Sequence, residues 1–192
     1  MTSRLFPDDP PLFAHRPPRA PIAATPGPLD TVPASVRLAL AAAGPVAMGA
    51  VLGARIASVS PVLALPVIVA GVTAVTAPAL YIATAATGSA PSAQTMATAV
   101  VRALTALGVV LLGLAAPVAF LVATTTSVAA GVVVSSLALG AASLAGLSAL
   151  HRALFAGQPG SLLRDGLFAA WAVVAMIIAG RLYLDLAVGV AS

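Results

Sequence analysis

Between residues 103 and 150 the chain carries no acidic, basic or histidine side chain, with Arg102 before this stretch and His151 after it. A helix of a soluble protein must present a polar face to water, so a soluble fold cannot use an uncharged stretch of this length. One crossing of a bilayer takes about 20 apolar residues. The stretch is long enough for two crossings, and its most polar run, residues 124–127, predicts the turn between them. We therefore expect a transmembrane helical hairpin here.

The composition of the whole chain indicates a membrane protein as well. Hydrophobic residues make up 60% of the sequence and charged residues 7%, and the mean hydropathy is +1.09. A soluble domain carries about 25% charged residues. All basic residues are Arg and all acidic residues are Asp, which, with the abundant Ala, indicates the coding bias of a GC-rich bacterium. Because the arginines flank apolar helices, they are explained as topology signals, and we expect no nucleic-acid partner.

Residues 1–33 differ from the rest of the chain in being rich in proline. Proline lacks an N–H donor and fixes φ, so this segment is predicted to be a disordered tail rather than a helix or a strand. Pro18 and Pro21, following Arg16, form a PxxP element of the kind that aromatic grooves bind. A solvated tail in which this pattern arises from composition alone is the simpler interpretation.

Residues 34–192 are predicted to form a five-helix transmembrane domain, which makes the chain an all-α polytopic membrane protein. Turn chemistry separates the expected helices, most clearly at residues 87–92 and at Gly157 with Pro159. The predicted spans are residues 34–57, 61–86, 96–123, 127–154 and 161–188.

Small residues at helical spacing predict where these helices approach one another. Gly49 and Gly53 form a GxxxG motif in the first span, and Ser136, Gly140 and Ser143 form a stripe in the fourth. Small side chains let backbones come close in lipid, where packing replaces the hydrophobic effect as the driving force between helices. We expect both sets of residues to mediate helix packing.

The distribution of arginines predicts the orientation of the chain. With the N-terminus in the cytoplasm, seven arginines fall on the cytoplasmic side and only Arg55 and Arg181 on the other. Positive charge is retained on the cytoplasmic side of membrane proteins. Five spans then place Ser192 outside, and a bacterial inner membrane is the expected location.

Familiar catalytic motifs are absent from the sequence, including HExxH, the Walker phosphate loop and GxSxG. We expect no enzyme activity, cofactor or metal site, and interpret His15 and His151 as solvated or interfacial. Arg181 and Asp185 are four residues apart on one helix face, the spacing of an ion pair. An ionisable pair inside a membrane is a functional candidate. Its place in the last turns of the final span favours an interfacial anchor, and both interpretations stay open.

Three local patterns resemble the five-span Yip-domain family of integral membrane proteins and its bacterial relatives. They are Pro78-Ala79-Leu80-Tyr81 before a polar turn, Gly113-Leu114-Ala115-Ala116-Pro117 followed by Phe120 and the threonine run, and the final helix from Trp171 to Leu184. The resemblance covers most of residues 35–190, although the tail lacks the acidic and aromatic motifs of the eukaryotic members. It implies a non-enzymatic membrane protein involved in organisation or partner binding.

Two functions are therefore compared. The first is an accessory or scaffold membrane protein that binds other membrane or cytoplasmic proteins besides the lipid bilayer. The second is a small transporter or channel subunit, with hydroxyl groups such as those of Thr73, Thr76 and Ser136 around its kinked helices. Transporters usually carry internal repeats or charge at mid-membrane, and neither is evident here.

Overall fold

The computed structural model describes residues 32–88 and 91–189, and within them it contains five helices and no strand. These are α1 (Ala34–Ile56), α2 (Ser60–Ala86), α3 (Ala93–Thr124), α4 (Val128–Phe155) and α5 (Leu162–Gly189). All five are long and apolar enough to cross a membrane. The all-α class and the five helices are thus confirmed. The prediction for the proline-rich tail falls on residues 1–31, which lie outside the described residues.

The starts of α3 and α4 are set by capping side chains that hydropathy alone does not locate. The largest difference from the predicted spans is at α3, which begins at Ala93 rather than at residue 96. Its cause is Ser92, whose hydroxyl accepts a hydrogen bond from the amide of Thr95 at 3.1 Å. Ser127 caps α4 in the same way. α3 and α4 therefore begin at hydroxyl side chains in the turns that precede them.

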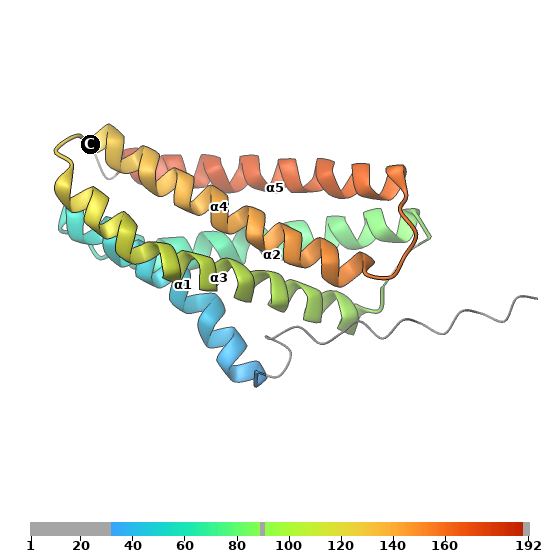
Figure 1. Cartoon of the computed structure of the whole chain (residues 1–192). Helices are drawn as coiled ribbons and strands as arrows, with labels where there is room; N and C mark the ends of the chain where they lie inside the picture. The colour runs from blue at the N-terminus through green and yellow to red at the C-terminus, as the bar shows by residue number, and fades with distance from the viewer. Residues whose placement is uncertain (1–31, 89–90, 190–192) are drawn as a thin grey trace, which may run out of the picture.

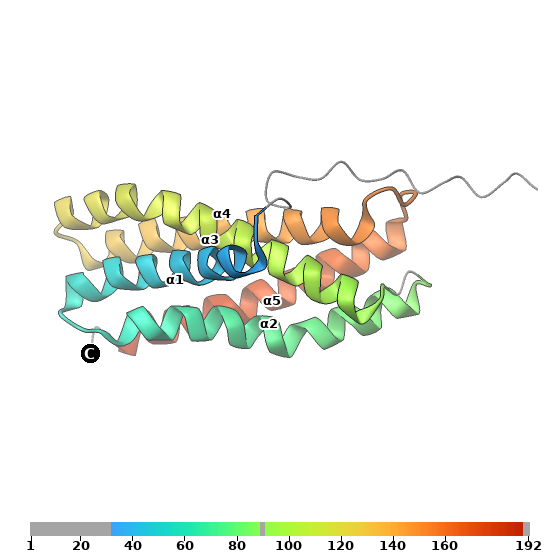
Figure 2. The ribbon, with the colours of Figure 1, turned by 90° about the horizontal axis from the view of Figure 1, so that it is seen from below.

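The five helices form a ring in the order α1, α2, α5, α4, α3, with α3 again beside α1 (Figures 1 and 2). Contact is most extensive between α3 and its two neighbours, α4 and α1. Among neighbours in the ring, contact is sparsest between α4 and α5. α3 is therefore held firmly from both sides, whereas α5 packs mainly on α2.

The two ends of the bundle differ in the number of helices that reach them. One end, called here the Arg55 end, carries the α1–α2 and α3–α4 turns, and the opposite Arg164 end carries the α2–α3 and α4–α5 turns (Figure 1). The backbone carbonyl of Arg37, in the first turn of α1, accepts a hydrogen bond from Thr105 Oγ1 at 3.2 Å. Because Thr105 lies well inside α3, α1 starts partway along the bundle. The Arg164 end thus consists of four helices.

Two apolar clusters fill the interior, one toward each end. The cluster toward the Arg55 end is formed by Met48, Leu65, Leu111, Val118, Val122, Ala138, Ala142 and Tyr183. The cluster toward the Arg164 end is formed by Leu80, Met96, Ala99, Leu150, Leu154, Phe155 and Phe168.

A pair of glycines sets the crossing of α1 and α3. A Cβ atom at Gly108 would collide with the carbonyl oxygen of Leu40 and lie 2.9 Å from the Cα atom of Ala41. A Cβ atom at Gly44 would in turn collide with the carbonyl of Gly108. The backbones meet directly at this point, so the crossing requires glycine on both helices.

Arg55 ties the end of α1 to the end of α3. Its Nη1 atom donates hydrogen bonds to the carbonyl oxygens of Val122 at 2.5 Å and Thr125 at 3.2 Å. The last carbonyls of a helix have no partner within the helix, so an arginine from the neighbouring helix satisfies them here.

Candidate functional site

A cavity of 120 Å³ lies inside the ring, with walls contributed by α2, α3, α4 and α5. It adjoins both apolar clusters, through Leu107 on one side and through Leu80 and Leu150 on the other. Its lining is mostly apolar, and its hydroxyl-bearing members are Thr73, Thr76 and Ser143. We take this cavity as the first candidate site.

The polar groups that line the cavity on α2 and α5 already have partners within the protein. Thr73 Oγ1 donates to the carbonyl of Val69, and Thr76 Oγ1 donates to that of Val72, each at 2.7 Å. The indole N–H of Trp171 donates to the carbonyl of Thr76 at 2.8 Å, which joins α5 to α2. The hydroxyl groups of both threonines are therefore engaged by the backbone of their own helix.

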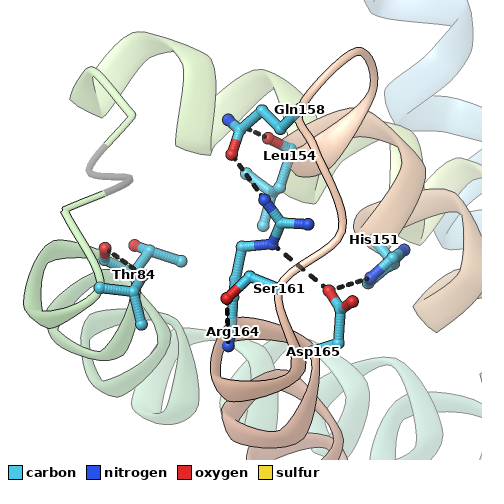
Figure 3. Close-up of polar contacts among 8 residues, drawn as sticks. Thr84, His151, Leu154, Gln158, Ser161, Arg164 and Asp165 are labelled. Carbon is cyan, nitrogen blue, oxygen red and sulfur yellow. Dashed lines mark hydrogen bonds and ion pairs between the residues drawn. The ribbon is translucent and has the colours of Figure 1, made fainter.

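A second candidate site is a polar cluster at the turn between α4 and α5 (Figure 3). Arg164 is only 6% exposed. Its Nη1 atom donates to Gln158 Oε1 at 2.9 Å, and its Nε atom donates to Asp165 Oδ1 at 3.3 Å. Asp165 Oδ1 also lies 3.4 Å from His151 Nε2. The cluster thus connects the last turn of α4 to the first turn of α5.

Aromatic side chains enclose this polar cluster. The Arg164 guanidinium lies 4.6 Å from the centroid of the Phe155 ring, a cation–π contact. His151 makes edge contacts with Phe155 and Phe168, with ring centroids 5.0 Å apart in both cases. A buried arginine is tolerated because its donors and its ring contact are satisfied together. The arrangement fixes a turn and offers no activated nucleophile.

The glycines of the predicted GxxxG motif both lie at the junction of α1 and α2. A Cβ atom at Gly49 would collide with the carbonyl of Pro61 and lie 2.8 Å from Val62 Cα. A Cβ atom at Gly53 would collide with the carbonyl of Ser58, in the turn that follows α1. The motif therefore brings the first turn of α2 against the end of α1.

The predicted stripe on α4 is divided between different surroundings. Ser143 lines the cavity. Ser136 donates its hydroxyl to the carbonyl of Val132 at 2.7 Å. A Cβ atom at Gly140 would have no neighbour within 4 Å, so the close contact predicted there is not made within a single chain. The glycine of α4 that does touch α3 is Gly146, whose Cβ atom would lie 3.1 Å from the carbonyl of Ala103.

Arg181 and Asp185 form the expected contact along one face of α5. Arg181 Nη2 lies 3.4 Å from Asp185 Oδ1, and the two side chains are 76% and 58% exposed. The pair points away from the bundle, while Tyr183 between them turns inward. The Tyr183 hydroxyl forms a buried hydrogen bond of 2.6 Å with Ser135 Oγ. The pair itself takes no part in the interior of the described bundle.

Sequence reasoning missed the role of the α4–α5 turn. It interpreted His151 only as interfacial or solvated, and did not predict that this half-exposed side chain packs against two aromatic rings and lies beside Asp165. The signal was available, since residues of opposite charge on both sides of a short helix–helix turn are brought together by the antiparallel hairpin.

Among residues 32–88 and 91–189, no group of three potential metal ligands is close enough to hold a metal ion.

Comparisons of this chain with protein-family models, with curated proteins and with solved structures found no match.

Proposed function

We propose that this chain is a non-enzymatic integral membrane protein that serves as an accessory or scaffold for other membrane or cytoplasmic proteins. The observation that carries the proposal is the bundle itself: five helices of membrane-spanning length and apolarity surround an apolar interior. In this proposal the bundle is a membrane platform, and the proline-rich residues 1–33 bind the partner. Such a segment stays open to binding, with part of its ordering entropy already removed by proline.

The orientation in this proposal follows the arginine distribution. Residues 1–33 face the cytoplasm of a bacterium, the chain crosses the inner membrane five times, and Ser192 lies outside. The resemblance to the five-span Yip-domain family supports the same arrangement and the same kind of role. Partners bound by the tail are then cytoplasmic proteins, with a groove for proline-rich peptides as the expected binding surface.

A transporter is the weaker alternative because of the chemistry of the cavity. A permeation path needs hydroxyls or carbonyls that can coordinate a solute. In the cavity, the hydroxyls of Thr73 and Thr76 are held by backbone carbonyls of their own helix. Apart from Ser143, the walls that remain are apolar and do not replace the hydration shell of an ion or a polar solute.

Deletion of residues 2–29 tests the proposal. The deletion is expected to leave insertion and bundle stability nearly unchanged and to abolish recovery of soluble partners in mild detergent, as measured by mass spectrometry. Replacing Pro18 and Pro21 by alanine keeps the length of the tail and examines the PxxP element separately. A recovered partner should bind a synthetic peptide of residues 1–33 directly.

The matched control changes hydroxyls of the bundle instead of the tail. Thr73→Ala with Ser136→Ala is expected to leave partner recovery as it is in the unmodified chain. The transporter alternative expects the reverse: a silent tail deletion, and loss of solute flux in reconstituted vesicles when the bundle hydroxyls are removed. Solute flux that persists without the tail would overturn the scaffold proposal.

A further inference from the structure

The cavity inside the ring has the chemistry of a hydrocarbon site. Its volume is 120 Å³ and its walls are largely apolar. Apolar cavities of about 150 Å³ stay free of water and take up molecules the size of benzene. A space of this kind therefore gains from an apolar guest, whose atoms restore the dispersion contacts that its walls lack.

At the junction of α4 and α5, a groove on the outside of the bundle lies next to this cavity. The two helices are tied at the Ser135–Tyr183 hydrogen bond and again at the α4–α5 turn, and contact between them is sparse. An outer groove there is lined by Leu144, Leu147, Ser148, His151, Arg152 and Phe168. Leu147 lines both the groove and the cavity, so the two spaces adjoin.

The outer end of the groove is basic. Arg152 is exposed, and its guanidinium lies along α4, with Nε donating to the carbonyl of Ser148 at 3.2 Å and Nη2 lying 3.5 Å from Ser148 Oγ. No carboxylate of residues 32–88 or 91–189 forms an ion pair with Arg152. The neighbouring acid, Asp165, is engaged by His151 and Arg164. A guanidinium in this position suits a phosphate group.

The order of these features along α4 matches a lipid molecule. Arg152 lies in the last turn of the helix, at the Arg164 end of the bundle, and the cavity lies deeper, beside Ser143 and Leu147. In a bilayer the phosphate of a lipid is at the surface and its acyl chains run inward. We propose that the groove and the cavity bind one anionic phospholipid, with its phosphate on Arg152 and a few methylene groups of one acyl chain passing Leu147 into the cavity.

This inference rests on the membrane location in the proposed function, although not on the partner-binding role of the tail. Photocrosslinking tests it in phosphatidylcholine vesicles that contain phosphatidylglycerol with a diazirine in one acyl chain. Mass spectrometry then identifies the modified residues. We expect adducts on the cavity lining, such as Ser143 and Met176. With phosphatidylcholine carrying the same acyl chain, these adducts should fall by about fivefold, the effect of one arginine at an anionic surface.

Two matched pairs of variants separate the parts of the site. Ala175→Phe places a ring in the cavity and is expected to abolish the cavity adducts, whereas Ala170→Phe, on the exposed side of α5, should preserve them. Arg152→Gln should lower the yield with phosphatidylglycerol to that with phosphatidylcholine. Arg181→Gln, which removes an exposed arginine elsewhere, should leave the yield unchanged. Circular dichroism melts verify that each variant is folded.

Two results would overturn the lipid site. One is a set of adducts confined to outward-facing residues such as Ile177, and the other is an equal yield of cavity adducts for the two lipids. Failure of the proposed function itself is seen in other measurements. If the chain does not float with vesicles in a density gradient, it is not a membrane protein and both proposals fail. If it floats but no partner is recovered through its tail, only the scaffold role fails.

Discussion

The α1–α3 crossing predicts that two identical substitutions on one helix have opposite effects on stability. Gly108 and Gly113 both lie on α3. The position of a Cβ atom at Gly108 is blocked by backbone atoms of Leu40 and Ala41, and at Gly113 it has no neighbour within 4 Å. Gly108→Ala should therefore destabilise the bundle, and Gly113→Ala should not.

The magnitude follows from two terms. Replacing glycine by alanine inside a helix gains up to about 1 kcal/mol in helix propensity. Overpacking costs about 1–3 kcal/mol, and more where nothing can yield. At Gly108 the obstacle is the backbone of α1 rather than a side chain that could rotate, so α1 must move as a unit. We expect a net loss of about 2 kcal/mol for Gly108→Ala and a gain of zero to about 1 kcal/mol for Gly113→Ala.

Unfolding by increasing dodecyl sulfate in mild-detergent micelles measures this difference. The chain has one tryptophan, Trp171, whose indole N–H bonds the carbonyl of Thr76, so its fluorescence reports the separation of α5 from α2. Circular dichroism follows loss of helix in the same samples. Gly44→Ala should resemble Gly108→Ala, and the double variant should cost less than the sum, since both remove the same contact. Shifts of equal sign and size for Gly108→Ala and Gly113→Ala would refute the reasoning.

Three further predictions use other contacts. Tyr183→Phe should lower stability by about 1 kcal/mol in the same unfolding titration, because the buried hydrogen bond that joins α4 to α5 is lost while Ser135 keeps only its bonds within α4; an unchanged midpoint would contradict this. Arg164→Leu should lower the free energy of unfolding by about 2–4 kcal/mol, because the partners of this buried arginine are left unsatisfied. Arg181→Leu, which removes an exposed pair, should lower it by less than about 1 kcal/mol, and similar losses for the two variants would show that burial does not distinguish them. A cysteine in place of Ser127 should react with a membrane-impermeant reagent in intact cells, which the absence of native cysteine makes measurable; protection there would reverse the proposed orientation.

The helices could be predicted from the sequence because length and hydropathy decide them almost alone. Uncharged stretches and turn residues located all five, and the start of α3 was placed late because the Ser92 cap was not used. The order of the ring could not be predicted in this way. In a soluble helix the apolar face marks the core, but here inner and outer faces are equally apolar, so periodicity carries little information on neighbours.

The same limit explains the residues of the candidate sites. The stripe on α4 predicted a face of small residues but not its direction: a Cβ atom at Gly140 would have no neighbour within 4 Å, whereas one at Gly146 would meet α3. In the sequence, Gly44 and Gly108 cannot be distinguished from glycines without a close neighbour, such as Gly113. Arg164 had only been counted as a positive charge on one side. Its burial depends on the turn in which Gly157 adopts a φ of 77°, and the arginine side chain then folds over Phe155.

The unequal lengths of α1 and α3 have a consequence for the surrounding membrane. At 1.5 Å per residue, the 23 residues of α1 measure about 34 Å and the 32 residues of α3 about 48 Å. For a chain inserted as proposed, lipids beside α1 meet a shorter helix than lipids beside α3. Thicker membranes therefore place the mismatch on the α1 side, where the bilayer must thin or the helix must stand more upright. α1 is then the side of the bundle that senses a hydrocarbon core thicker than about 34 Å, whereas α3 is long enough to span it.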